Sequence, residues 1–169
     1  MRQLGLLRVL RGDVSGAAAL LSKAPGLGWS DPDHPGHTLF PLFATLLSKG
    51  DIDTALLNEL EATAGEPLDR LIEADEGAAP RLITPPVVAL IDRARVRATL
   101  ADAGRDAVID AMRIAAEKRL QGILEHSRRR HYGHAALLVA SSVAYAPKKR
   151  AAEFVRWAVG LDEQYRRRH

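Results

Sequence analysis

Two runs of arginine carry the clearest potential for chemistry in this 169-residue chain. Each run follows a stretch with helical spacing, and a tyrosine stands close to each. Guanidinium groups bind carboxylates and phosphates through paired hydrogen bonds, and an aromatic ring beside them adds a stacking surface. We therefore expect these residues to bind a partner with an acidic surface. The predicted partner-binding residues are Arg128, Arg129, Arg130, Tyr132, Tyr165, Arg166, Arg167 and Arg168.

The arginine runs also have a purely structural interpretation. A cation at a helix C-terminus interacts favourably with the helix dipole, by about 0.3–1 kcal/mol. In an up-down-up arrangement the predicted helices 106–130 and 147–168 point the same way, so both arginine runs lie at one edge. A third basic run, Lys148–Arg150, begins the last helix. We expect it at the opposite edge, where it cannot join the same patch.

Histidine offers a second kind of chemistry, because imidazole and carboxylate groups bind divalent metals. No recognised metal-binding spacing is present, and His131 and His134 flank a glycine instead of sharing one helical face. The first group also has the composition of a turn before a helix. We therefore predict no metal ligands. The residues concerned are Asp31, Asp33, His34 and His37 in one loop and His126, His131 and His134 in another.

Signatures of catalysis are missing. The chain has no phosphate-binding glycine-rich loop, no Gly-x-Ser-x-Gly and no His-Glu-x-x-His. It contains no cysteine, which excludes disulfides and thiolate zinc sites. We predict a protein that is not an enzyme and needs no cofactor. The Trp29–His37 loop is a second candidate for function, because long loops often carry binding residues.

Charge is divided unevenly along the chain. Residues 1–112 hold 11 Lys and Arg against 16 Asp and Glu, whereas residues 113–169 hold 13 against 5. Such asymmetry points to an acidic partner near the C-terminal end, which includes nucleic acid, or to self-association. No apolar run approaches the roughly 20 residues of a membrane span, and we identify no secretory signal. We predict no membrane association and a cytoplasmic location.

Alanine and leucine supply most of the apolar residues and favour helices, and no segment alternates like a strand. The chain breaks fall at Gly12-Asp13, Pro25–Gly28 and Ala103-Gly104, among others. Between such breaks, the spacing predicts helices over residues 1–11, 13–24, 37–48, 51–64, 66–72, 84–100, 106–130, 134–145 and 147–168.

The chain partly repeats itself. Residues 120–131 and 158–169 share glycine, glutamate and Arg-Arg-Arg-His at a spacing of 38, and Arg11–Val14 recurs at 49–52 as Lys-Gly-Asp-Ile. A fixed period in this range is typical of stacked helical hairpins. The Gly-Asp elbow resembles tetratricopeptide and HEAT-type repeats, although the large aromatics of the former are missing. The stretches 132–138 and 165–169 are similar to helical segments of bacterial SWIM zinc-finger proteins, without their zinc ligands.

These observations predict an all-α fold. Seven or eight of these helices stack as antiparallel hairpins in a short irregular solenoid with a period of about 38 residues, forming one domain over 1–169 that we expect to be truncated at its C-terminal end. The predicted function is a non-catalytic protein–protein interaction module, a scaffold or adaptor. A nucleic-acid-associated protein is the alternative, and a metal-dependent enzyme with histidine-bearing loops is the third.

Overall fold

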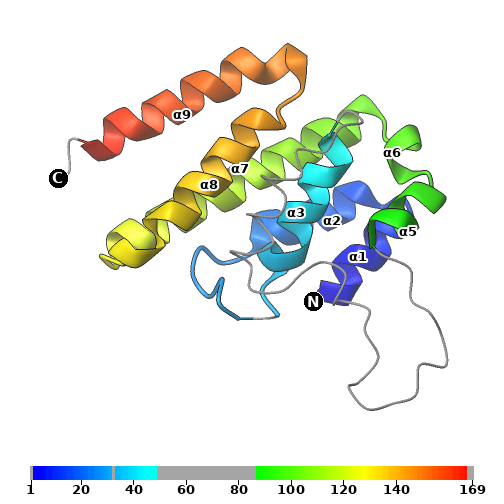
Figure 1. Ribbon diagram of the computed structural model, residues 1–169, viewed down its shortest axis with the longest axis horizontal. Coiled ribbons are helices and arrows are strands. Elements are labelled where there is room, and N and C mark those ends of the chain that lie inside the picture. The colour runs from blue at the N-terminus through cyan, green and yellow to red at the C-terminus, as the bar shows by residue number, and fades with distance from the viewer. Residues whose placement is uncertain (1, 32, 49–86, 167–169) are drawn as a thin grey trace.

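The computed structural model of the chain describes residues 2–31, 33–48 and 87–166, and every regular element in these ranges is a helix (Figure 1). The predicted all-α class is confirmed for them. The predicted helices 51–64 and 66–72, and the second Gly-Asp elbow, lie outside the described residues. The elements are α1 (Arg2–Leu10), α2 (Val14–Lys23), α3 (Pro35–Leu47), α5 (Val87–Arg93), α6 (Val96–Thr99), α7 (Asp102–Glu125), η2 (Arg129–His131), α8 (Tyr132–Ala144), η3 (Lys148–Arg150) and α9 (Ala151–Arg166).

The elbow between α1 and α2 follows directly from its two residues. Gly12 has a φ of 81°, a left-handed conformation that glycine adopts without a steric penalty. Its N–H donates to Val9 O at 2.9 Å, and the next N–H donates to Arg8 O at 2.8 Å, which closes α1. Asp13 then accepts a hydrogen bond from Gly16 N and caps α2. The sequence prediction of this elbow is confirmed.

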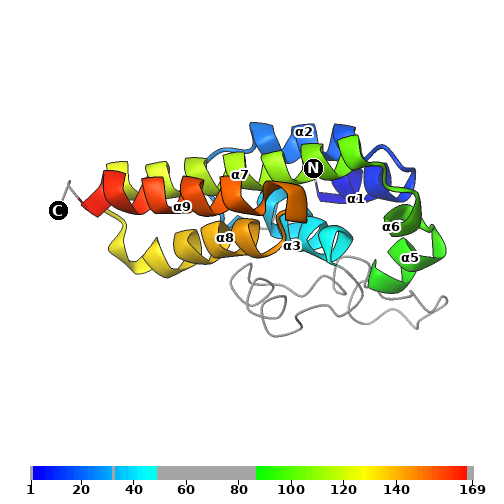
Figure 2. The ribbon, with the colours of Figure 1, turned by 90° about the horizontal axis from the view of Figure 1, so that it is seen from above.

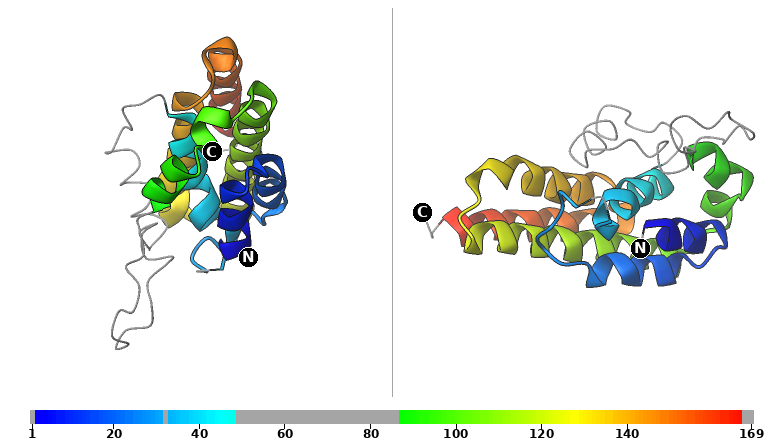
Figure 3. Two further views of the ribbon diagram at one scale, coloured as in Figure 1. Left: turned by 90° about the vertical axis from the view of Figure 1, so that its right-hand side faces the viewer. Right: turned by 90° about the horizontal axis from the view of Figure 1, so that it is seen from below.

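Helix α3 forms the centre of the core. All its residues from Gly36 to Leu47 are buried, and nearly all are apolar. A helix that is hydrophobic on every side must be surrounded by other elements. It packs against α1, α2 and α7, and both views of Figure 3 show it beside the first two helices.

Helix α7 is the longest described element, and it packs against the N-terminal helices α2 and α3 as well as the C-terminal helix α8. Helix α2 packs along it, and α8 packs against it and runs back in the opposite direction (Figures 1 and 2). Helix α9 then reverses direction again, so it points the same way as α7. Among the described helices, none combines the length and apolar character needed to cross a membrane.

The loop after α2 reaches the backbone of α7 because it contains glycine. A Cβ on Gly26 would lie 2.1 Å from Lys118 O, which no larger residue tolerates. From the other side, Lys118 Nζ donates to Ser22 O at 2.7 Å, near the end of α2. This close approach brings Gly26 and Leu27 against α7 beside Lys118 and Gly122. Trp29, which follows in the same loop, meets His134 of α8.

Two predicted boundaries between residues 84 and 106 are wrong. The predicted helix 84–100 is divided into α5 and α6 at Arg95, whose φ of 55° interrupts the helical backbone. The predicted break at Ala103-Gly104 does not exist, because α7 begins at Asp102 and continues through it. A Cβ on Gly104 would lie 2.6 Å from the Leu100 side chain. This glycine therefore allows close packing and does not end a helix.

Candidate functional site

Helix α7 ends five residues earlier than its apolar spacing predicts. The N–H of Arg128 donates to Ile123 O at 2.9 Å, and the N–H of Ser127 donates to Leu124 O at 3.2 Å. Ser127 has a φ of 50°. These bonds form the Schellman motif that commonly closes helices, with serine in the place usually held by glycine. The turn fixes the direction in which the arginine run leaves α7.

The first arginine run is exposed and carries no internal countercharge. Arg128, Arg129 and Arg130 all have exposed side chains, and none forms an ion pair with any residue that the structure describes. Arg130 Nε donates to His131 Nε2 at 3.2 Å. Tyr132, the first residue of α8, is half-buried beside them.

The second arginine run is described only at its start. Tyr165 is half-buried in the last turn of α9, and Arg166 ends that helix. The remaining predicted residues, Arg167 and Arg168, lie outside the described residues. Because α7 and α9 run the same way, their C-terminal ends lie at the same end of the molecule (Figures 1 and 2). We call Arg128–Arg130 together with Arg166 the basic end.

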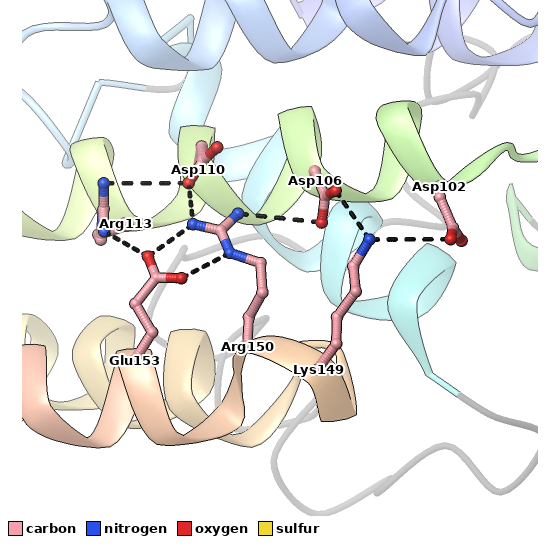
Figure 4. Close-up of polar contacts among 7 residues, drawn as sticks. All are labelled: Asp102, Asp106, Asp110, Arg113, Lys149, Arg150 and Glu153. Atoms are coloured by element: carbon pink, nitrogen blue, oxygen red, sulfur yellow. Dashed lines mark hydrogen bonds and ion pairs between the residues drawn. The ribbon is translucent and has the colours of Figure 1, made fainter.

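The third basic run lies at the opposite end, as predicted, and its residues Lys149 and Arg150 are ion-paired there. Lys149 Nζ lies 3.0 Å from a carboxylate oxygen of Asp106 and 3.7 Å from one of Asp102. Arg150 Nη2 lies 2.8 Å from Asp110 Oδ1 (Figure 4). The three aspartates are spaced four residues apart, so they share one face of α7. That spacing is a sequence signal for an ion-paired helix interface.

Glu153 and two arginines complete this network. Arg150 Nη2 donates to Glu153 Oε1 at 2.7 Å, and Arg113 Nη1 donates to the same oxygen at 3.1 Å. Both guanidinium groups also lie over the Phe154 ring, at 5.6 Å for Arg113 and 5.2 Å for Arg150. Hydrogen bonds to Glu153 and Asp110 raise the pKa of Arg150. Lys149 and Arg150 therefore hold the start of α9 on α7, and their charges are already matched within the chain.

The aromatic rings of the predicted Trp29–His37 loop pack inward, whereas Ser30, Asp31 and Asp33 are exposed. Trp29 is only 5% exposed, and its ring centroid lies 4.7 Å from that of His34 and 5.0 Å from that of His134. His34 Nε2 lies 3.0 Å from Pro25 O, and His34 Nδ1 accepts a hydrogen bond from Gly36 N at 3.1 Å. Both ring nitrogens of His34 therefore have protein partners, and its proton is on Nε2.

The two histidine-bearing loops meet in space, which their sequence positions do not indicate. His37 is buried and contacts Trp29 O through Nε2, and its ring centroid lies 6.3 Å from that of His34. His134 reaches the same cluster from the first turn of α8. Among the residues that the structure describes, no three histidines or carboxylates are placed to hold a metal ion.

A buried arginine is the residue that the sequence reasoning missed. Arg119 is 4% exposed and lies on the inward face of α7. Its Nε donates to His134 Nδ1 at 3.2 Å, and its Nη1 makes a long contact of 3.4 Å with Gly26 O. The sequence did hold a signal for the burial of Arg119. This residue follows Met112 and Ala116 and precedes Ile123 in the apolar stripe of the helix.

Burial and positive neighbours keep the surrounding imidazoles neutral. Desolvation, followed by the charge of Arg119, lowers the pKa of His134 to about 4. Desolvation also lowers the pKa of His34, and with Arg119, Arg130 and Arg128 it lowers the pKa of His131. Desolvation and then Arg128 lower the pKa of Arg119, although a guanidinium stays charged at neutral pH. The electrostatic environment of Arg119 and His134 therefore disfavours a bound cation and favours a bound anion.

Comparisons of the chain with protein families, with curated proteins and with solved structures gave no match.

Proposed function

We propose that this protein is a non-catalytic interaction module that binds an acidic surface of another protein through its basic end. One observation carries the proposal, and it is the contrast between the two described basic runs. Lys149 and Arg150 are ion-paired within the chain. Arg128–Arg130 are exposed and have no carboxylate partner among the described residues. Their charge is available to a second molecule, and a carboxylate-rich surface complements it.

The arrangement of the last three helices supports a binding surface at this end. Helices α7, α8 and α9 alternate in direction, so the arginine run after α7 lies at the same end of the molecule as Arg166, the last residue of α9. These positions are the two copies of the repeated motif. We propose that the helices form part of a short irregular solenoid of antiparallel hairpins with a period of about 38 residues, since such stacks leave an extended surface for partners.

Nucleic-acid binding is the second candidate, favoured by the basic excess of residues 113–169. Proteins that follow a single strand combine a basic groove with aromatic rings on which bases stack. Tyr132 and Tyr165 are half-buried, which limits the ring area they offer. A metal-dependent enzyme is the third candidate, and the charge of Arg119 beside His134 disfavours a cation there.

The experiment compares two triple variants with the same change in charge. One replaces Arg128, Arg129 and Arg130 with alanine. The other replaces three exposed arginines elsewhere in the fold, Arg11→Ala, Arg93→Ala and Arg156→Ala. Fluorescence anisotropy follows a labelled glutamate-rich peptide and a labelled single-stranded oligonucleotide of equal length, at about 50 mM and about 200 mM salt.

We expect the peptide to bind the wild type and the control variant, and to bind the basic-end variant at least about tenfold more weakly. Equal binding by the two variants contradicts the proposal, because the location of the charge then has no effect. Tight binding of the oligonucleotide without binding of the peptide supports the nucleic-acid alternative.

A further inference from the structure

The charge of Arg119 has no countercharge in the described part of the chain. Its side chain is almost completely buried, and both of its hydrogen-bond partners, His134 Nδ1 and Gly26 O, belong to neutral groups. No carboxylate of the described residues lies within ion-pair distance of it. Buried charges in proteins are normally paired, because an isolated ion in the interior is costly. An anion from outside the chain would supply the missing charge.

The groups around Arg119 add positive charge. Arg128 is close enough to act on Arg119 electrostatically, and Arg128 and Arg130 act on His131 in the same way. The first turn of α8 lies here too, since it contains His134. The N-terminus of a helix carries a partial positive charge and offers backbone N–H groups, which stabilise anions. The charge of Arg119 on α7, the charge of Arg128 before η2 and the positive end of α8 therefore reinforce one another.

The two imidazoles orient the guanidinium groups without balancing their charge. His134 Nδ1 accepts from Arg119 Nε, and His131 Nε2 accepts from Arg130 Nε. An imidazole nitrogen that accepts a hydrogen bond is unprotonated, so each ring is a neutral acceptor. Each bond fixes one edge of a guanidinium. Nη1 of Arg119 is taken by Gly26 O, whereas Nη2 of Arg119 and both Nη groups of Arg130 have no partner among the described residues.

The cluster is open toward solvent at the start of α8. A Cβ built on Gly133 would meet no atom within 4 Å. His131 and Tyr132, just before it, are half-buried, and Arg128 is exposed. A ligand can therefore approach Arg128 and the first turn of α8 from the side where Arg128–Arg130 face solvent.

We propose that Arg119, Arg128 and the first turn of α8 form a binding site for one phosphate monoester. Two guanidinium charges and a helix N-terminus match a group that carries about −1.5 to −2 at neutral pH better than they match a single carboxylate. The inference rests on the proposed function, because the phosphate monoester is carried by the acidic partner of the basic end. A free phosphate ester would present the same chemistry.

The first measurement is thermal unfolding with increasing inorganic phosphate, against chloride at equal ionic strength. The Tm of the wild type rises with phosphate and then saturates. Arg128→Ala, a change at an exposed position, raises the phosphate concentration needed by about tenfold, and Arg119→Lys does the same if it folds. Arg156→Ala, which removes one exposed charge from α9, leaves the concentration unchanged.

The second measurement is anisotropy of a labelled glutamate-rich peptide with one phosphoserine, beside its unphosphorylated form. Phosphorylation tightens binding to the wild type by about tenfold and has no effect with Arg128→Ala. A phosphate-specific rise in Tm without any effect of peptide phosphorylation also supports the site and assigns it to a free phosphate ester.

Phosphate that acts no better than chloride overturns the site. So does an equal response of Arg128→Ala and Arg156→Ala. Either result leaves the proposed function standing if the unphosphorylated peptide still binds. Loss of peptide binding with a retained phosphate effect instead refutes the proposed function.

Discussion

Acid should destabilise this protein through His134. The imidazole of His134 is half-buried. None of its neighbours stabilises its protonated form; they are Arg119 of α7, His37 of α3, His34 before α3 and His131 of η2. Protonation would also remove the nitrogen that accepts the hydrogen bond from Arg119 Nε. The folded state therefore holds His134 neutral where the unfolded chain binds a proton.

The size of the effect follows from the pKa difference. The pKa is about 4 in the folded protein and 6.5 for an ordinary histidine. A histidine with a lowered folded-state pKa contributes its full stability above the unfolded-state value and loses it as the pH falls toward the folded-state value. At 1.36 kcal/mol per unit, the free energy of unfolding falls by about 2 kcal/mol by pH 5 and about 3 kcal/mol by pH 4.

The assay is urea unfolding from pH 8 to pH 4, followed by tryptophan fluorescence, for the wild type and for His134→Asn. Asparagine offers an amide oxygen near the position of Nδ1 and does not titrate. At pH 8 the variant has a constant deficit, because it loses the ring contact with Trp29. Carboxylates and the other histidines titrate in both proteins, so their effects cancel in the difference.

As the pH falls from 8 to 4, the difference in unfolding free energy between the two proteins should shrink. It then reverses in sign if the constant deficit of the variant is below about 3 kcal/mol. Two parallel curves over this whole pH range would refute the reasoning. They would mean that His134 titrates alike in the folded and unfolded states.

Three further changes test other parts of the fold by urea unfolding at neutral pH. Ser127→Gly should raise the free energy of unfolding by about 0.5–1 kcal/mol, because it removes a side chain from a left-handed position; a loss would show that the serine is not strained. Arg150→Met should lower the free energy of unfolding by about 1–3 kcal/mol, because the change removes ion pairs and the contact with Phe154. This loss should be smaller at about 1 M salt, which screens the ion pairs. A loss independent of salt would assign the effect to packing alone. Gly26→Ala should lower it by more than about 1 kcal/mol, since its Cβ would overlap Lys118 O, and an unchanged stability would show that the loop can move away from α7.

Local features of the fold could be predicted from the sequence because their causes are local. Glycine followed by aspartate at positions 12 and 13 carries both the helix stop and the next cap, and the structure uses both. The separation of Lys148–Arg150 from Arg128–Arg130 follows from helix direction alone. The predicted chain break at Gly104 was wrong because, in the sequence, a glycine in the first turn of a helix cannot be told from one that ends a helix. Only its packing against Leu100 distinguishes the two cases.

The candidate site could not be predicted from the sequence because it depends on tertiary contacts. Arg119, Gly26 and His134 meet only when the loop after α2 packs on α7 and α8 folds back, and no pattern of spacing encodes that meeting. An arginine inside an apolar helical stripe was the available signal. The early end of α7 was also invisible, because serine at position 127 gives no hint of a left-handed turn.

The burial of α3 has a consequence for how the protein is made. During synthesis this apolar helix leaves the ribosome well before α7, on which it packs. At roughly 5–20 residues per second, the chain needs on the order of 4–16 s to extend from the end of α3 to the end of α7. Over that interval the apolar faces of α3 that later meet α7 lack their partner. We therefore expect the folding yield of the nascent chain to depend on the supply of chaperones that bind apolar segments.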